Sequence, residues 1–174
     1  MGLHRRTYKR NREFVTAVKH ELELYLISAQ NLEDVSSCFG RGGIQTYAVA
    51  WVQPDHKLRT SIDNFNGQNP NWNAYISLSL DAKLLEEETT ALTINIYNHG
   101  CLWDKLVGTV RVLVSDLING QKYLTGKCMT FMVMRPSGRR QGQLHLGIPP
   151  SAYQLVDSFR KETTPILSEE PMQR

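Results

Sequence analysis

Alternating apolar and polar residues recur through the middle of the chain and predict β-strands. Alternation places successive side chains on opposite faces of an extended strand, which is the period of a half-buried antiparallel strand. The pattern is most regular at 72–80, where every second residue is apolar. Eight such segments are expected, separated by loops rich in Gly, Asn and Pro: 22–26, 47–51, 58–62, 72–80, 92–97, 110–114, 131–133 and 144–148.

Short strands at this spacing, without a convincing long helix between them, favour an all-β fold, an eight-stranded antiparallel β-sandwich. Two strands alone are only marginally stable. The later strands are therefore expected to complete a sandwich over the pair within residues 22–52. Residues 84–90 contain three consecutive glutamates and predict either a helical turn or a solvated connection.

Charge is distributed unevenly along the 174 residues. Residues 1–20 hold six Lys and Arg side chains against one Glu, a net charge of +5, whereas the whole chain carries +3. The length suits one globular domain of roughly 100–150 residues. We therefore expect a flexible basic arm at 1–20, a folded domain at 21–149 and a polar tail at 150–174.

The sequence predicts neither a signal peptide nor a membrane span, because no apolar run approaches the ~20 residues that cross a bilayer. Cys38, Cys101 and Cys128 are an odd number without CxxC spacing. This argues against a disulfide framework and favours a reduced, cytoplasmic compartment. Cys38 and Cys101 are expected in two loops of the same end, beside His99, so a metal or redox pair there is a minor alternative.

Catalysis and specific nucleic-acid binding find little support. The five histidines lack a metal-ligand spacing such as HExxH, and no GxSxG, P-loop or GxGxxG motif is present. The basic tract at 5–12 contains a single aromatic residue for base stacking, Tyr8. Such a tract contacts phosphates without sequence specificity. We therefore expect a protein that is not an enzyme and has no specific nucleic-acid partner.

Four stretches together carry a resemblance to a known family. They are LELYLISAQNLEDV at 22–35, NPNWN at 69–73, DKLVGTVRVLVSDL at 104–117 and MRPSGRRQGQLHLGI at 134–148. Over about residues 20–149 the chain resembles the small plant C2-domain proteins of the cold- and stress-regulated type, including those associated with copine-dependent suppression of cell death. The resemblance implies an eight-stranded C2 sandwich whose loops at one end face phospholipid, often through calcium.

Calcium binding in this family implies carboxylates in two loops, since the ion takes six to eight oxygen ligands. The positions that match the family's ligands in this sequence are Asp34, Gln45, Asn98, Gly100 and Lys105, with Asp104 adjacent to the last. At most two of these residues are carboxylates, and a lysine stands where the charge of the metal would lie. The sequence therefore predicts no physiological calcium binding and no other cofactor.

Strand parity in an antiparallel sandwich places the loops 30–45, 63–71, 98–105 and 135–141 at one end. The predicted membrane-docking residues there are Phe39, Arg41, Phe65, Leu102, Trp103, Lys105, Arg139 and Arg140. An amphipathic Trp suits the headgroup boundary, and cations suit an anionic leaflet. The alternative is that the aromatic residues fold back as core. Lys57 and Arg59 on the third strand indicate either a headgroup patch or a solvated strand face.

These observations predict a non-catalytic C2 domain that docks peripherally on anionic phospholipid membranes without calcium. The expected location is the cytoplasm, at the plasma membrane, in plant stress or defence signalling with a protein partner, for which a copine-like protein is one candidate. The alternative is a protein-interaction module on a degenerate C2 scaffold that no longer meets lipid. An exposed Trp103 and the pair Arg139 and Arg140 favour lipid, and burial of Trp103 would weaken that preference.

Overall fold

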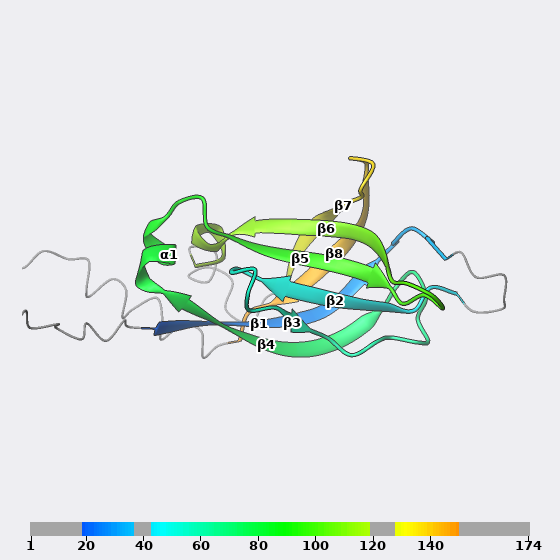
Figure 1. Cartoon of the computed structure of the whole chain (residues 1–174), viewed down its shortest axis with the longest axis horizontal. Helices are drawn as coiled ribbons and strands as arrows, with labels where there is room; N and C mark the ends of the chain where they lie inside the picture. The colour runs from blue at the N-terminus through cyan, green and yellow to red at the C-terminus, as the bar shows by residue number, and fades with distance from the viewer. Residues whose placement is uncertain (1–18, 37–42, 119–127, 150–174) are drawn as a thin grey trace, which may run out of the picture.

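The computed structural model of the protein describes residues 19–36, 43–118 and 128–149. In these ranges lie eight strands, one short helix and a second helical turn at 114–118 (Figure 1). The bounds are β1 Lys19–Gln30, β2 Thr46–Trp51, β3 Leu58–Arg59, β4 Asn71–Asp81, α1 Ala82–Glu86, β5 Ala91–Asn98, β6 Lys105–Leu113, β7 Cys128–Met134 and β8 Arg140–Gly147. A strand lies in each of the eight predicted segments, but the third is only Leu58–Arg59 and not 58–62. Residues 19–20, which were predicted as part of the arm, begin β1, and the rest of the predicted arm and the predicted tail lie outside the described residues.

All neighbouring strands are antiparallel, in the order β3-β2-β5-β6-β7-β8-β1-β4. β6 and β7 are joined at a single residue pair, Thr109 with Met134. The continuous sheet is therefore divided into two four-stranded halves, which Figure 1 shows as two stacked layers. The predicted antiparallel sandwich is confirmed, and its layers are held together chiefly by the side chains between them.

The core lies between the two layers, where alternate residues of each strand are buried. Leu24 and Leu26 of β1 lie in one cluster with Ile94 and Ile96 of β5, although the two strands belong to different layers. Burial of a large apolar side chain of this kind stabilises the fold by roughly 1.5–3 kcal/mol. The alternation seen in the sequence thus marks the buried side of these strands.

β2 buries its small residues and turns its large ones outward. Ala48 and Ala50 are fully buried within the core cluster, whereas Tyr47 and Trp51 lie under cationic side chains on the outer face. Both faces of this strand are apolar, so periodicity alone does not indicate which one is buried. The structure assigns the alanines to the core, where their cross-strand partners on β5 are the larger Ile96 and Ile94.

The strand registers bring four loops to one end of the sandwich. We call this end the loop pole and define it by the described residues 31–36, 43–45, 60–70, 99–104 and 135–139. Gln68 accepts a backbone hydrogen bond from Leu32 at 3.0 Å, and Arg135 forms an ion pair with Glu33. In Figure 1 the hairpin between β7 and β8 projects away from the other loops of this end. The predicted gathering of loops is confirmed, with that hairpin standing apart.

Candidate functional site

The first residue of β2 fastens two loops of the pole to the sheet. Thr46 and Asp63 exchange backbone hydrogen bonds of 3.1 and 2.8 Å, and on its other side Thr46 pairs with Asn98 at the end of β5. The indole Nε1–H of Trp72 donates to the Thr46 carbonyl at 3.0 Å. The loops that follow Asp63 and Asn98 therefore start from one rigid point in the sheet.

Asp63 holds the first of these loops in shape. Its carboxylate accepts hydrogen bonds from the backbone N–H groups of Phe65 and Asn66 at 2.9 and 3.0 Å, and from Asn71 N–H and Asn66 Nδ2 at 2.7 Å each. Burial by itself raises the pKa of Asp63, but these hydrogen bonds outweigh burial and lower the pKa to about 2. The turn formers around 63–71 predict a loop, but they give no signal for the role of this carboxylate.

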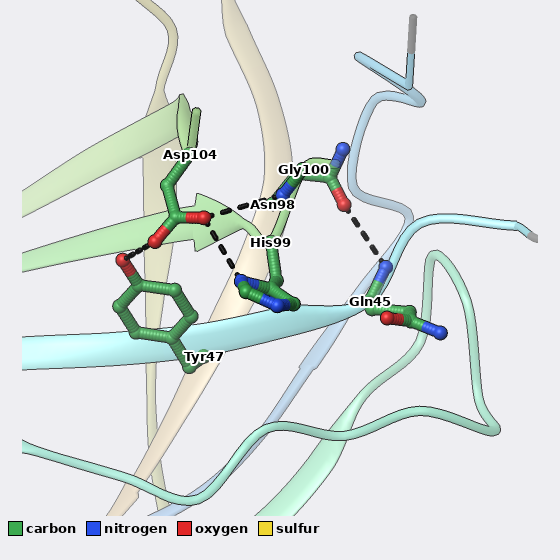
Figure 2. Close-up of polar contacts among 6 residues, drawn as sticks. All are labelled: Gln45, Tyr47, Asn98, His99, Gly100 and Asp104. Carbon is green, nitrogen blue, oxygen red and sulfur yellow. Dashed lines mark hydrogen bonds and ion pairs between the residues drawn. The ribbon is translucent and has the colours of Figure 1, made fainter. Parts of the chain in front are cut away.

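Asp104 closes the second loop onto β2 (Figure 2). The Tyr47 hydroxyl donates to Asp104 Oδ2 at 2.5 Å, and the Gly100 N–H donates to Oδ1 at 3.2 Å. His99 Nδ1 lies 2.9 Å from the same Oδ1. The hydrogen bond from Tyr47 is the largest cause of the lowered pKa of Asp104, so the carboxylate is stabilised in its charged form. The base of the loop is therefore a polar network in which both carboxylate oxygens of Asp104 already have partners.

Removal of the Tyr47 hydroxyl tests this network. Burial and the hydrogen bond to Asp104 raise the pKa of Tyr47 to about 12, so the phenol remains a donor at neutral pH. The Tyr47→Phe variant is expected to lose about 1–2 kcal/mol of unfolding free energy, because a charged acceptor loses its donor. Urea denaturation measures the loss, with Tyr25→Phe on the opposite layer as the matched control. Equal stability of both variants would contradict a structural role for the hydroxyl.

The tip of this loop needs a glycine. A Cβ at Gly100 would lie 2.1 Å from the Trp103 carbonyl oxygen, so any other residue would force the turn open. The turn leaves Leu102 84% and Trp103 65% exposed at its outer end. Phe65, on the neighbouring loop, is 93% exposed. The alternative in which the aromatic tips fold back as core is therefore wrong for Phe65 and Trp103.

The cations predicted to surround these tips are placed differently from one another. Lys105 begins β6, next to the loop and half-buried, whereas Arg139 and Arg140 are exposed on the β7–β8 hairpin. Phe39 and Arg41 lie outside the described residues. Phe65, Leu102 and Trp103 thus lie with Lys105 at the ends of neighbouring strands. Arg139 and Arg140 form a separate group at the same end of the sandwich.

The positions that would hold calcium are used in other ways. Asp34 is exposed and accepts a hydrogen bond from Ser36 N–H at 2.8 Å. Asn98 is buried, and its Oδ1 accepts the Gln45 N–H at 3.0 Å, as Figure 2 shows. Within 19–36, 43–118 and 128–149, no three His, Cys, Asp or Glu side chains are arranged to hold a metal ion. The side chains described at this end do not fit a calcium ion.

Two cations lie against aromatic rings on the outer face of β2 and β3. Lys57 Nζ is 4.8 Å from the Trp51 ring centroid, and the Arg59 guanidinium carbon is 3.7 Å from that of Tyr47. Such contacts are worth about 0.5–1 kcal/mol at exposed sites and hold the cation in place. Tyr47 therefore contacts both Arg59 and Asp104, which connects this face to the loop pole. The structure brings the two residues of the predicted headgroup patch to one face.

The cysteines differ from the expectation drawn from their number. Cys101 is disulfide-bonded, whereas Cys128 is free and exposed. The expected absence of disulfides is therefore wrong at Cys101. Cys38 lies outside the described residues. An odd count without CxxC spacing says nothing about a single bridge, so the count no longer supports an assignment to a reducing compartment.

Comparison with known proteins identifies the fold. The family model of the C2 domain matches residues 20–129. Two relatives from Arabidopsis thaliana are "Protein SRC2 homolog", 31% identical with 71% of this chain and 38% of that protein covered, and "Multiple C2 domain and transmembrane region protein 11", 27% identical with 85% and 19% covered. The chain thus spans well under half the length of either relative.

Solved structures agree with this match at the level of fold. The structure of two tandem C2 domains from extended synaptotagmin 2 aligns with a TM-score of 0.59 at 18% sequence identity, over 84% of this chain and 47% of that one. Among the residues that the structure describes, no helix has the length and apolar content to cross a bilayer.

Proposed function

The chain belongs to the C2 domain family, and from that premise we propose that it is a non-catalytic module that docks on anionic phospholipid membranes through its loop pole. The observation that carries the proposal is the exposure of Phe65, Leu102 and Trp103 on two loops fastened to the same residue of β2. A rigid support lets apolar side chains remain exposed in water, ready to insert without further ordering.

The magnitudes favour weak and reversible docking. Burial of a large apolar side chain contributes roughly 1.5–3 kcal/mol, and each Lys or Arg near an anionic leaflet about 1 kcal/mol. Insertion of three tips beside Lys105 offsets the entropy lost on association by a modest margin. Salt should weaken the binding, because the cationic part is screened within a Debye length of about 8 Å at physiological ionic strength.

Docking without calcium is part of the proposal. Support comes from Asp104, whose carboxylate is already occupied by Tyr47, His99 and Gly100, and from the Asn98 side chain, which is bonded to the backbone of Gln45. A cation would have to displace these partners and would find at most one further carboxylate among the family's ligand positions. Lys105 beside Asp104 would add repulsion.

Thermal unfolding provides a direct check on calcium. A protein whose dissociation constant for calcium is 100-fold below the applied calcium concentration would gain about 2.7 kcal/mol of stability. A gain of this size raises Tm by several degrees. We expect Tm in about 1 mM calcium to equal Tm in chelator within about 1 °C. Magnesium at the same concentration is the control for ionic strength. A rise of several degrees with calcium alone would overturn the calcium-independent part of the proposal.

Vesicle co-sedimentation tests the docking itself. The full chain is expected to sediment with vesicles that contain phosphatidylserine or a phosphoinositide, equally in calcium and in chelator, and to stay in solution with pure phosphatidylcholine. High salt should release it. Failure to bind any anionic vesicle would contradict the proposal and favour the alternative, a protein-interaction module on the same scaffold.

The cellular context proposed here rests on the family resemblance. We place the protein at the cytoplasmic leaflet of the plasma membrane, because that leaflet carries anionic lipids. Plant stress or defence signalling, with a copine-like protein as partner, is the proposed setting. Co-purification from plant membranes with and without a salt wash would identify such a partner.

A further inference from the structure

The outer face of β1 and β4, in the layer opposite β2, carries an exposed pair of tyrosines. Tyr25 and Tyr75 are register partners in the two strands. Their rings meet edge to face with centroids 5.4 Å apart, and the residues are 38% and 51% exposed. Tyrosine combines an apolar ring with a polar tip and is enriched at binding interfaces for that reason.

Carboxylates flank this tyrosine pair toward the start of β1. Glu21 and Glu23 lie on the same side of β1 as Tyr25, and Asp81 lies on the same side of β4 as Tyr75, because strand side chains alternate. The Ser77 hydroxyl donates to Glu21 at 3.0 Å. A hydrogen bond with Glu23 is the largest cause that raises the pKa of Tyr75 to about 12. We call these five residues the tyrosine face: Tyr25, Tyr75, Glu21, Glu23 and Asp81.

The residues that precede β1 have the complementary charge and join the sheet at this face. Residues 1–18 contain five Lys and Arg side chains and one Glu, a net charge of +4. Lys19, the first residue of β1, is the register partner of Asp81. From Lys19 to Tyr25 the strand rises only about 20 Å, whereas an extended chain of 18 residues reaches up to about 60 Å. The segment is therefore long enough to fold back over the whole face.

We propose that residues 1–18 bind the tyrosine face of the same chain. Arginine suits both parts of this face, since its guanidinium pairs with carboxylates and stacks on aromatic rings. Covalent attachment gives the segment an effective concentration in the millimolar range, so individually weak contacts suffice. One consequence rests on the proposed function: the tyrosine face and an anionic membrane compete for the same basic segment.

Zero-length carbodiimide coupling on the full chain tests the contact. The reagent joins an amine to a carboxylate only when the two touch, and mass spectrometry identifies the linked peptides. We expect Lys9 to couple to Glu21, Glu23 or Asp81 at 50 mM NaCl, with a yield independent of protein concentration. At 500 mM NaCl the yield should fall at least fivefold, because the contact is ionic and exposed. Arg6→Lys and Arg12→Lys variants supply further amines along the segment.

Charge reversal distinguishes this contact from nonspecific coupling. Glu21→Lys with Glu23→Lys should abolish the coupling of Lys9 to Asp81. Adding Arg10→Glu and Arg12→Glu should restore this coupling. Asp34, at the opposite end of β1, is the control carboxylate. Coupling to Asp34 as often as to the tyrosine face, no coupling from any of the three lysines, or coupling only between chains and rising with concentration would overturn the proposal. The last of these results would point to a second copy instead.

Vesicle binding separately tests whether the tyrosine face and the membrane compete for residues 1–18. The double variant Glu21→Gln with Glu23→Gln frees the basic segment and is expected to bind phosphatidylserine vesicles about three- to tenfold more tightly than the unmodified chain. The control Asp55→Asn with Asp116→Asn removes two exposed charges away from both the loop pole and the tyrosine face and should not. If the unmodified chain binds no vesicles, the proposed function fails while the coupling result still decides this inference. Unchanged vesicle affinity in the double variant, with normal binding by the unmodified chain, would contradict the competition.

Discussion

Replacement of Asp63 by alanine is expected to lower the free energy of unfolding by about 3 kcal/mol. The side chain is nearly buried and satisfies the backbone N–H groups of Phe65, Asn66 and Asn71. Loss of the carboxylate leaves these donors without their acceptor, and each such loss costs about 1–3 kcal/mol when the donor is buried. The loop that carries Phe65 should lose its shape together with this stability.

The contribution of Asp63 to the free energy of unfolding depends on pH in a direction that its pKa determines. Hydrogen bonding lowers the pKa of Asp63 from 3.8 to about 2 in the folded protein, so the unfolded chain binds the proton first as pH falls. The stabilisation is therefore complete above about pH 4 and is lost as the pH falls through the folded pKa. Between pH 5 and pH 2 the unmodified protein should lose about 2 kcal/mol from this group alone.

Urea denaturation across this pH range measures the effect. The Asp63→Asn variant lacks the titration, so its stability deficit should narrow as pH falls from 5 to 2. Asp55→Asn, in the exposed turn between β2 and β3, is the matched control and should change stability by less than about 0.5 kcal/mol. A deficit for Asp63→Asn that stays constant over the range would show that the carboxylate does not hold the loop in its charged form.

Simultaneous replacement of Phe65, Leu102 and Trp103 by serine is expected to weaken binding to phosphatidylserine vesicles by about 100-fold or more. Each tip contributes roughly 1.5–3 kcal/mol when it is fully buried in the membrane, and even partial insertion of three tips gives about 3 kcal/mol, which corresponds to a factor of about 100. All three side chains are exposed, so Tm should fall by no more than about 2 °C.

The control for this variant is an exposed apolar residue away from the loop pole. Leu113→Ser, at the end of β6 opposite the loop pole, removes a partly exposed side chain and should leave vesicle affinity within about twofold. Surface plasmon resonance on captured vesicles compares the two variants with the unmodified chain. Equal affinities for all three proteins would rule out insertion of these tips and leave only electrostatic attraction as an explanation of any binding.

The strands and the antiparallel sandwich, but not the order of the strands in the sheet, could be predicted from the sequence because alternation is local. In β4 the apolar residues at 72–80 mark one face without reference to any other part of the chain. Strand parity then placed the loops at common ends, and the registers confirm that placement. The loss of calcium-ligand carboxylates at Gln45 and Lys105 is likewise visible in the sequence once the family resemblance assigns their positions.

Other features depended on contacts between distant residues. Alternation in β2 is apolar on both faces, and only packing against Ile94 and Ile96 shows that Ala48 and Ala50 are the buried pair. The network at Asp104 joins it to Tyr47, 57 positions earlier in the chain. A single side chain in a loop gives no local signal of such a partner.

The sequence by itself determined the eight strands, the antiparallel sandwich, the basic charge before β1 and the scarcity of carboxylates at the calcium positions. Only the tertiary structure decided that Trp103 is exposed, that Asp63 is a buried support and that Tyr25 and Tyr75 form one face with their neighbouring carboxylates. The physical reason is that the spacing of apolar residues along a strand indicates which face of the strand is buried. The exposure of a loop tip and the hydrogen-bond partners of a carboxylate depend instead on which distant segments fold against them.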